Sequence, residues 1–215
     1  MRDKWYGDNR DLVKWAVLVA LARRYRVKHI LQVLYFRPDM WAGVEIDGKS
    51  VEMNQAVIEQ FRRAASISMM NCGARIEVVE DVFSDRTVYL QRVLDRIRHR
   101  PQAPGIVFLD PDTGLEPGKP NLKHVLDSEL AEIWRSMIPD DLMVFYQHQT
   151  NRNGEEWIEP KKSQFERALN IRPGSAKLAH GVKIARDVAF FFAAKENSER
   201  KVESRVGRPA LKAES

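Results

Sequence analysis

The sequence predicts an α/β fold with three layers, in which helices cover both faces of a mostly parallel central sheet. Candidate strands alternate with amphipathic helices along most of the chain, and the strands are nearly continuously apolar, as strands buried on both faces are. The chain has 215 residues, of which 44% are hydrophobic, which is enough for one sizeable core. We therefore expect a single α/β domain over residues 1–195, followed by a charged, disordered tail over residues 196–215.

The chain begins with a helix and a strand. Residues 11–25 repeat apolar side chains at helical spacing, and Asp8 or Asn9 can cap the first turn. Residues 29–36 then form an apolar and aromatic run of the kind that strands prefer. This strand is expected to be buried and to end in the polar Arg-Pro-Asp sequence at 37–39.

The middle of the chain continues the pattern. Residues 42–50 are expected to form an irregular loop or a small hairpin, and residues 51–70 a second helix. Residues 74–82 alternate as a strand does, and residues 87–100 form a third amphipathic helix that Pro101 closes.

The second half repeats strand and helix in turn. Further strands are expected at three apolar runs, namely 105–109, 142–149 and 187–195. Helices are expected between them, at 123–137 and 162–170. This order is that of a parallel sheet whose connections cross over its faces.

Three of the strands end in polar clusters that a hydrophobic core does not require. The clusters are Tyr-Phe-Arg-Pro-Asp at 35–39, Asp-Pro-Asp-Thr-Gly at 110–114 and Tyr-Gln-His-Gln-Thr-Asn-Arg at 146–152. Since ligands in open parallel sheets bind outside the carboxyl ends of the strands, we expect the clusters to meet there and form the functional site. The structural alternative is an Asx-capped turn at 110–114 and an ordinary loop histidine at 148.

Carboxylates in this position can hold a hard cation. Asp110, Asp112 and Glu116 could bind magnesium for phosphodiester hydrolysis. Because the Asp-x-Asp spacing is common and unspecific, a magnesium-dependent nuclease or phosphoesterase is kept as an alternative function.

The order of elements over residues 74–195 is similar to the second half of class I S-adenosylmethionine-dependent methyltransferases. Their fourth strand often ends in an Asp-Pro-Pro-aromatic motif, and this chain has Asp-Pro-Asp at 110–112. The resemblance implies methyl transfer. That family also needs a glycine-rich turn after its first strand, where Leu-Tyr-Phe-Arg-Pro stands at 34–38, and no acidic residue ends a recognisable second strand. We therefore expect no cofactor, and a degenerate methyltransferase is the second alternative.

The aromatic residues of the clusters favour a third chemistry, hydrolysis of the bond between a base and its sugar. The reaction needs a carboxylate to stabilise positive charge or orient water, a donor to the departing base, and aromatic walls around a flipped base. Asp110 and Asp112, supported by Asp39, would supply the carboxylate, and His148 the donor. The base pocket would be lined by aromatic and amide side chains, namely Tyr35, Phe36, Tyr146, Gln147 and Gln149.

This layout resembles the architecture of the uracil-DNA-glycosylase superfamily. Those proteins are single α/β domains with a short parallel sheet, a polar proline-containing motif after the first strand, and a loop with histidine or asparagine after the last core strand. The matching positions are 37–39 and the Gln-His-Gln sequence at 147–149. The resemblance implies a metal-independent DNA glycosylase, which is the preferred hypothesis.

DNA is the partner that this hypothesis requires. The net charge of +5 is compatible with a polyanionic partner. Arg37, Arg152 and Lys161 would contact phosphate groups, which adds affinity but no sequence information. A basic α/β module that only binds nucleic acid or a protein is the non-enzymatic alternative.

The cysteine content and the lengths of the apolar runs indicate where in the cell the protein is expected. Cys72 is the only cysteine, which excludes an internal disulfide and a cysteine-based structural zinc site. No apolar run approaches the roughly 18 residues of a membrane span. The charged start of the sequence lacks the apolar core of a signal peptide. We therefore expect a soluble, cytoplasmic protein with no membrane partner.

Overall fold

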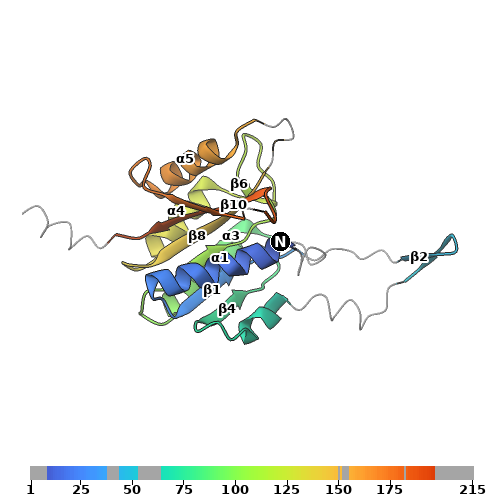
Figure 1. Cartoon of the computed structure of the whole chain (residues 1–215), viewed down its shortest axis with the longest axis horizontal. Helices are drawn as coiled ribbons and strands as arrows, with labels where there is room; N and C mark the ends of the chain where they lie inside the picture. The colour runs from blue at the N-terminus through green and yellow to red at the C-terminus, as the bar shows by residue number, and fades with distance from the viewer. Residues whose placement is uncertain are drawn as a thin grey trace, which may run out of the picture.

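The computed structural model describes residues 9–37, 44–52, 64–149, 151, 155–181 and 183–196 (Figure 1). Its centre is a sheet of six strands. Their spatial order is β4 (Arg75–Val79), β1 (His29–Val33), β5 (Ile106–Leu109), β8 (Leu142–His148), β10 (Val188–Ala194) and β9 (Lys177–His180). The first four strands run parallel, whereas β10 runs antiparallel to both β8 and β9. The predicted α/β fold class is confirmed.

Helices cover both faces of this sheet. They are α1 (Asn9–Tyr25), the 3₁₀ helix η2 (Ala64–Met69), α3 (Arg86–His99), α4 (Asp127–Ser136) and α5 (Ile158–Leu169). α1 crosses one face of the sheet, with η2 beside β4, and α3, α4 and α5 pack into the core on the other face (Figure 1). Successive strand residues point to opposite faces of the sheet. In β1, Ile30 therefore packs in the core under α1, and Leu31 packs in the core under α3, α4 and α5. None of the described helices combines the length and the apolar character of a membrane span.

Two smaller sheets have two strands each. β2 (Val44–Ile46) and β3 (Lys49–Val51) form a hairpin in the segment for which a loop or small hairpin was expected. Asp47 and Gly48 join them with φ of 50° and 74°, the left-handed values of a tight hairpin turn. β6 (Gly114–Leu115) and β7 (His124–Val125) pair in parallel after β5.

The helices predicted at 51–70 and 123–137 are wrong at their boundaries. The helix expected over 51–70 gives way to β3 at its start and to η2 at its end, and residues 53–63 lie outside the described residues. The helix expected from 123 begins at Asp127, because His124 and Val125 pair with β6. Its start is fixed by Glu116, whose Oε1 accepts the backbone N–H of Asp127 at 2.7 Å.

The last part of the chain differs from the prediction in two places. α5 begins at Ile158 and so includes Pro160, which fits the first turn of a helix because its missing N–H would have no partner there. β9 was not predicted, since it is a short edge strand with mostly exposed side chains and no apolar run. Residues 197–215 of the expected tail lie outside the described residues.

Asp141 holds the amino ends of β5 and β8 together. Its carboxylate accepts the backbone N–H of Gly105 at 3.0 Å and of Ile138 at 2.8 Å, and it pairs with Arg100. Both charged side chains are buried. Asp141→Ala would leave the guanidinium buried without its counter-charge, so we expect a loss of about 3–5 kcal/mol in the free energy of unfolding. Urea unfolding measures it, and a loss below about 1 kcal/mol would contradict this role.

Candidate functional site

The carboxyl ends of β1 and β5 form the topological switch point of the sheet. β1 pairs with β4 on one side and with β5 on the other, and Val33 is aligned with both Val79 and Leu109. The residues that follow these three therefore share one edge, where ligands bind in open α/β sheets. The three predicted polar clusters meet at this edge as far as they are described. Asp39 and Arg152 lie outside the described residues.

Asp110 is a buried ion-pair partner and does not face solvent. Only 1% of the residue is exposed. One carboxylate oxygen, Oδ2, accepts from Lys14 Nζ and from Gln32 Nε2, both at 2.9 Å. Lys14 also donates to Asp11 at 2.6 Å and lies 5.1 Å from the ring centre of Tyr146. This arrangement fixes the end of β5 against α1, and it keeps the Asp110 carboxylate from a substrate or a cation.

Burial and charge act in opposite directions within this cluster. Burial raises the pKa of the Asp110 carboxyl, and the Lys14 ammonium opposes that rise. Burial would lower the pKa of Lys14, but the carboxylates of Asp110 and Asp11 outweigh it, so that pKa lies above its usual value. Lys14 is therefore protonated at neutral pH and supplies the positive charge that Asp110 needs.

The three carboxylates of the predicted magnesium site do not form a cluster. Asp112 is paired with Arg37, and both side chains are mostly buried. Glu116 caps α4 through the Asp127 N–H, as described above. The described residues contain no group of three or more His, Cys, Asp or Glu that could hold a metal ion. The metal-ligand set proposed for a nuclease is therefore not assembled.

The two predicted tyrosine walls belong to the hydrophobic cores. Tyr35 is 3% exposed and packs edge-on against Phe83, with ring centres 5.2 Å apart. Tyr146 is 6% exposed and packs against Phe190 at 5.8 Å. Phe36 is half-buried and continues the pairing of β1 with β4, since its carbonyl oxygen accepts the Phe83 N–H at 2.7 Å. The prediction that Tyr35 and Tyr146 line an open base pocket is wrong, because both rings are needed to fill the space between sheet and helices.

Gln147 holds the loop that follows β5. It is fully buried, and its Oε1 accepts the Leu115 N–H at 2.9 Å. Its Nε2 donates to the carbonyl oxygens of Thr113 at 3.2 Å and His148 at 2.8 Å. Gln149 in turn donates through Nε2 to Asn151 at 3.1 Å. Both N–H groups of the Gln147 amide therefore have structural partners, and the Gln149 amide is engaged by Asn151.

His148 is held at both ring nitrogens. Nε2 lies 3.0 Å from Asp187 Oδ2, and Nδ1 lies 2.8 Å from the carbonyl oxygen of Gln149. Both ring nitrogens therefore have contacts within the protein. Arg10 donates to the same Asp187 oxygen at 2.6 Å. Burial would raise the pKa of Asp187, but Arg10 and His148 hold it below its usual value.

Asp187 and Arg10 were not singled out from the sequence. Asp187 directly precedes the last strand, and a parallel strand would place that end away from the site. Because β10 runs antiparallel to β8, its first residues lie at the switch-point edge. The direction of β10 cannot be read from its apolar pattern, so the sequence carried no signal for Asp187.

Lys161 is also engaged by the protein itself. Its Nζ donates to the carbonyl oxygens of Leu115 at 3.2 Å and Glu116 at 3.0 Å, and to Gln164 Oε1 at 2.8 Å. Burial lowers its pKa. Lys161 therefore ties α5 to the loop after β5, and the structure does not place it as a phosphate contact. Arg37, the other described candidate, is paired with Asp112.

Glu80 and Asp81 are acidic residues at the switch-point edge that the sequence pattern does not place there. They directly follow β4, which lies parallel to β1. Glu80 is exposed, and Asp81 pairs with Arg92 on α3 at 2.9 Å. The expectation that no acidic residue ends a second strand is therefore wrong. The pattern at 74–82 predicts a strand, but its position beside β1 depends on the pairing of the sheet.

Comparisons with known proteins give a likeness among solved structures. No family model matches the chain, and no curated protein matches it. Among solved structures, a Staphylococcus aureus protein assigned as a caffeoyl-CoA O-methyltransferase is similar, with 11% identity, a TM-score of 0.34, and coverage of 84% of this chain and 83% of that one. At this level the likeness carries no argument about function, which must come from the site itself.

Proposed function

We propose that the protein is an α/β enzyme of the class I methyltransferase type and that it binds S-adenosylmethionine across the ends of β4, β1 and β5. The strand arrangement carries this proposal. β10 runs antiparallel between β8 and β9, the two sheet strands that precede it in the chain. Class I methyltransferase sheets end in the same way. The resemblance that the sequence suggested for residues 74–195 thus extends to strand direction.

The acidic end of β4 fits the sugar of such a cofactor. In nucleotide-binding α/β folds an Asp or Glu at the end of the strand beside β1 accepts hydrogen bonds from ribose hydroxyls. Glu80 stands at that position as an exposed carboxylate. When bound, S-adenosylmethionine supplies an activated methyl group.

The turn after β1 can be made without glycine. Tyr35 has φ of +48°, in the left-handed region that glycine usually occupies, while its ring is held in the core by Phe83 and Tyr89. The contacts of the ring offset the free-energy cost of this backbone conformation. The absence of a glycine-rich sequence at 34–38 therefore does not prevent a sharp change of chain direction at the ligand edge.

Base removal remains a hypothesis that this geometry supports less well. Asp110 would have to leave its ion pair with Lys14, and His148 would have to release an acceptor before donating to a base. Asp112, another predicted catalytic carboxylate, would have to leave its ion pair with Arg37. The described part of the edge thus offers paired side chains where the reaction requires accessible ones.

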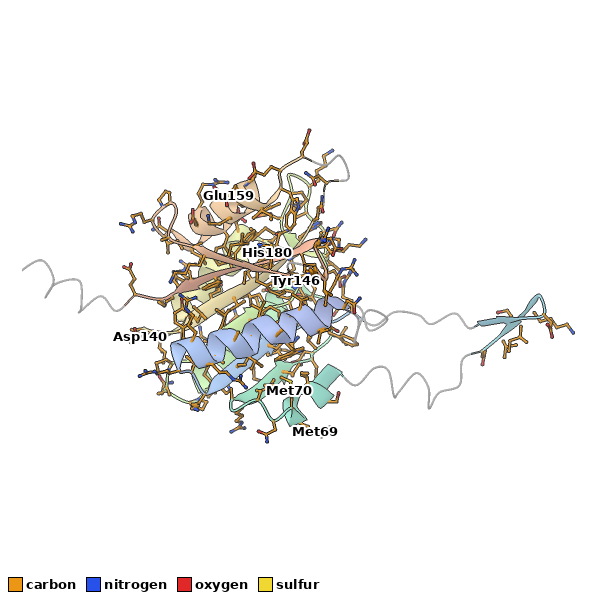
Figure 2. All side chains as sticks on the ribbon, viewed as in Figure 1. Met69, Met70, Asp140, Tyr146, Glu159 and His180 are labelled. Carbon is orange, nitrogen blue, oxygen red and sulfur yellow. The ribbon has the colours of Figure 1, made fainter. Side chains whose placement is uncertain are left out.

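Titration calorimetry with S-adenosylhomocysteine tests the proposal. We expect binding by the wild type, and about tenfold weaker binding by Glu80→Gln, because the variant loses charge-assisted hydrogen bonds to the ribose. Glu159→Gln is the matched control. Figure 2 shows Glu159 on α5, on the far side of the sheet from Met70, which precedes β4. The Glu159→Gln variant should bind S-adenosylhomocysteine as tightly as the wild type does.

Two results would reject the proposed function. One is no heat of binding with S-adenosylhomocysteine or S-adenosylmethionine at about 1 mM ligand. The other is equal binding by wild type and Glu80→Gln, which would place the ligand elsewhere. Incubation with DNA carrying normal, damaged or modified bases, in EDTA and followed by hot alkali, addresses the glycosylase hypothesis in the same preparation.

A further inference from the structure

A groove of about 470 Å³ lies at the end of the sheet opposite the switch point. It is built where α1, α4 and β10 end and where the chain leaves α5. α1 spans the molecule, so its first turn lies at the switch-point edge while Tyr25, its last residue, lines the groove. The groove is therefore separate from the proposed cofactor site by the length of the sheet.

Aromatic side chains from three elements line part of the groove. Tyr25 and Phe192 meet edge to face, with ring centres 6.4 Å apart. Trp134 of α4 lines the groove and is 9% exposed. Ile171 and Ala193 add further apolar surface. A concave surface of this size, in which apolar side chains lie beside polar and charged groups, can hold a small molecule.

Positive charge gathers at the same groove. Arg172 and Lys177 line it and are exposed, and Lys177 Nζ lies 3.2 Å from the Tyr25 hydroxyl and 5.7 Å from the centre of its ring. Lys195 also lines the groove, but its ammonium donates to the carbonyl oxygens of Trp134 and Arg135 at the end of α4.

These cations are not equivalent toward a ligand. The ammonium protons of Lys195 are used to cap α4, so Lys195 adds positive charge to the groove without offering a hydrogen bond to a ligand. Lys177 and Arg172 keep donors for an anion, since the Tyr25 contact uses one of the three protons of Lys177. Glu196 is the acidic residue among those that line the groove. The lining therefore carries an excess of positive charge beside an aromatic surface.

We propose that this groove is a second ligand site, for a small molecule with a flat apolar body and one carboxylate or similar anionic group. The body lies against Tyr25, Trp134 and Phe192, and the anion lies between Arg172 and Lys177. Neither element alone specifies this class. Aromatic rings would accept any flat molecule, and exposed cations would bind a free anion weakly, whereas their juxtaposition selects the combination.

Two probes of equal shape and different charge test this site. 2-Naphthoate and 2-naphthamide are titrated into isotopically labelled protein, and binding is followed through the Trp134 indole N–H resonance. We expect 2-naphthoate to shift this resonance and the amides of β9 and of the end of β10. It should bind at least about fivefold more tightly than 2-naphthamide, because only the carboxylate can pair with Arg172 and Lys177.

A variant with the charges removed provides the decisive comparison. Arg172→Gln with Lys177→Gln should weaken 2-naphthoate binding about fivefold or more and leave 2-naphthamide binding unchanged. Arg98→Gln with Lys162→Gln removes the same charge from α3 and α5 and should change neither. Equal binding of the two probes, unchanged binding by the first double variant, or shifts confined to other regions would overturn the proposal. Since S-adenosylhomocysteine binding is measured separately, neither result depends on the other.

Discussion

Replacing Lys14 by methionine is expected to reduce the free energy of unfolding by about 3–5 kcal/mol at neutral pH. The substitution leaves the Asp110 carboxylate buried without the ammonium that lies 2.9 Å away. Asp11 loses its ion pair with Lys14 at the same time. Methionine has a similar volume and apolar character to the lysine stem, so packing is largely kept. Urea unfolding, followed by circular dichroism, measures the loss.

The pH dependence of this loss separates charge from packing. Burial raises the folded-state pKa of Asp110 above its unfolded value of about 3.9. In the folded variant the charged form is therefore penalised at neutral pH, and the penalty is lost as pH falls through the raised pKa. We expect the difference from wild type to shrink as the pH falls from about 7 toward the ordinary pKa of a carboxyl group. A difference that is constant over this range would contradict the explanation.

A second substitution provides the matched control. Adding Asp110→Asn to Lys14→Met removes the orphaned charge, so the double variant should lose about 2 kcal/mol less than Lys14→Met alone. If the double variant is as unstable as the single one, the cost comes from the lost lysine contacts and not from the unpaired carboxylate.

Replacing Gly114 by alanine is expected to destabilise the fold by about 2–4 kcal/mol. Gly114 has φ of +132°, which side-chain-bearing residues rarely adopt. A Cβ atom there would lie 2.3 Å from Oε1 of Gln147, whose side chain is buried and bonded to Thr113 and Leu115. The loop after β5 and the end of β8 would have to move apart. Thermal and urea unfolding of the variant measure the cost.

Gly118 offers a control in the same loop. No atom lies within 4 Å of a Cβ built at Gly118, so Gly118→Ala should change the free energy of unfolding by less than about 0.5 kcal/mol. Equal effects of the two substitutions would mean that glycine at 114 serves general loop flexibility. A large effect at Gly114 alone would confirm that this residue is required by the close approach of Gln147.

Local sequence patterns predict where the polar clusters lie but not what their side chains contact. The prediction that the strands at 29–36, 105–109 and 142–149 end in polar clusters depended on local patterns, and the described parts of those clusters do share one edge. Their chemical roles depended on partners. Lys14 and Asp110 are 96 positions apart, and Gln147 and Leu115 are 32 apart. No local pattern indicates such pairs.

The sequence by itself determined the α/β class, because alternation of apolar runs with helical periodicity is a property of neighbouring residues. It also determined that Asp-Pro-Asp-Thr-Gly follows a buried strand. Only the tertiary structure decided that β4 lies beside β1, which brings Glu80 to the ligand edge, and that β10 is antiparallel, which brings Asp187 there. The physical reason is that contacts between distant segments set the strand order, the strand direction and the partners of buried charges. Such contacts depend on the packing of the whole core, so the residues next to each position in the sequence do not indicate them.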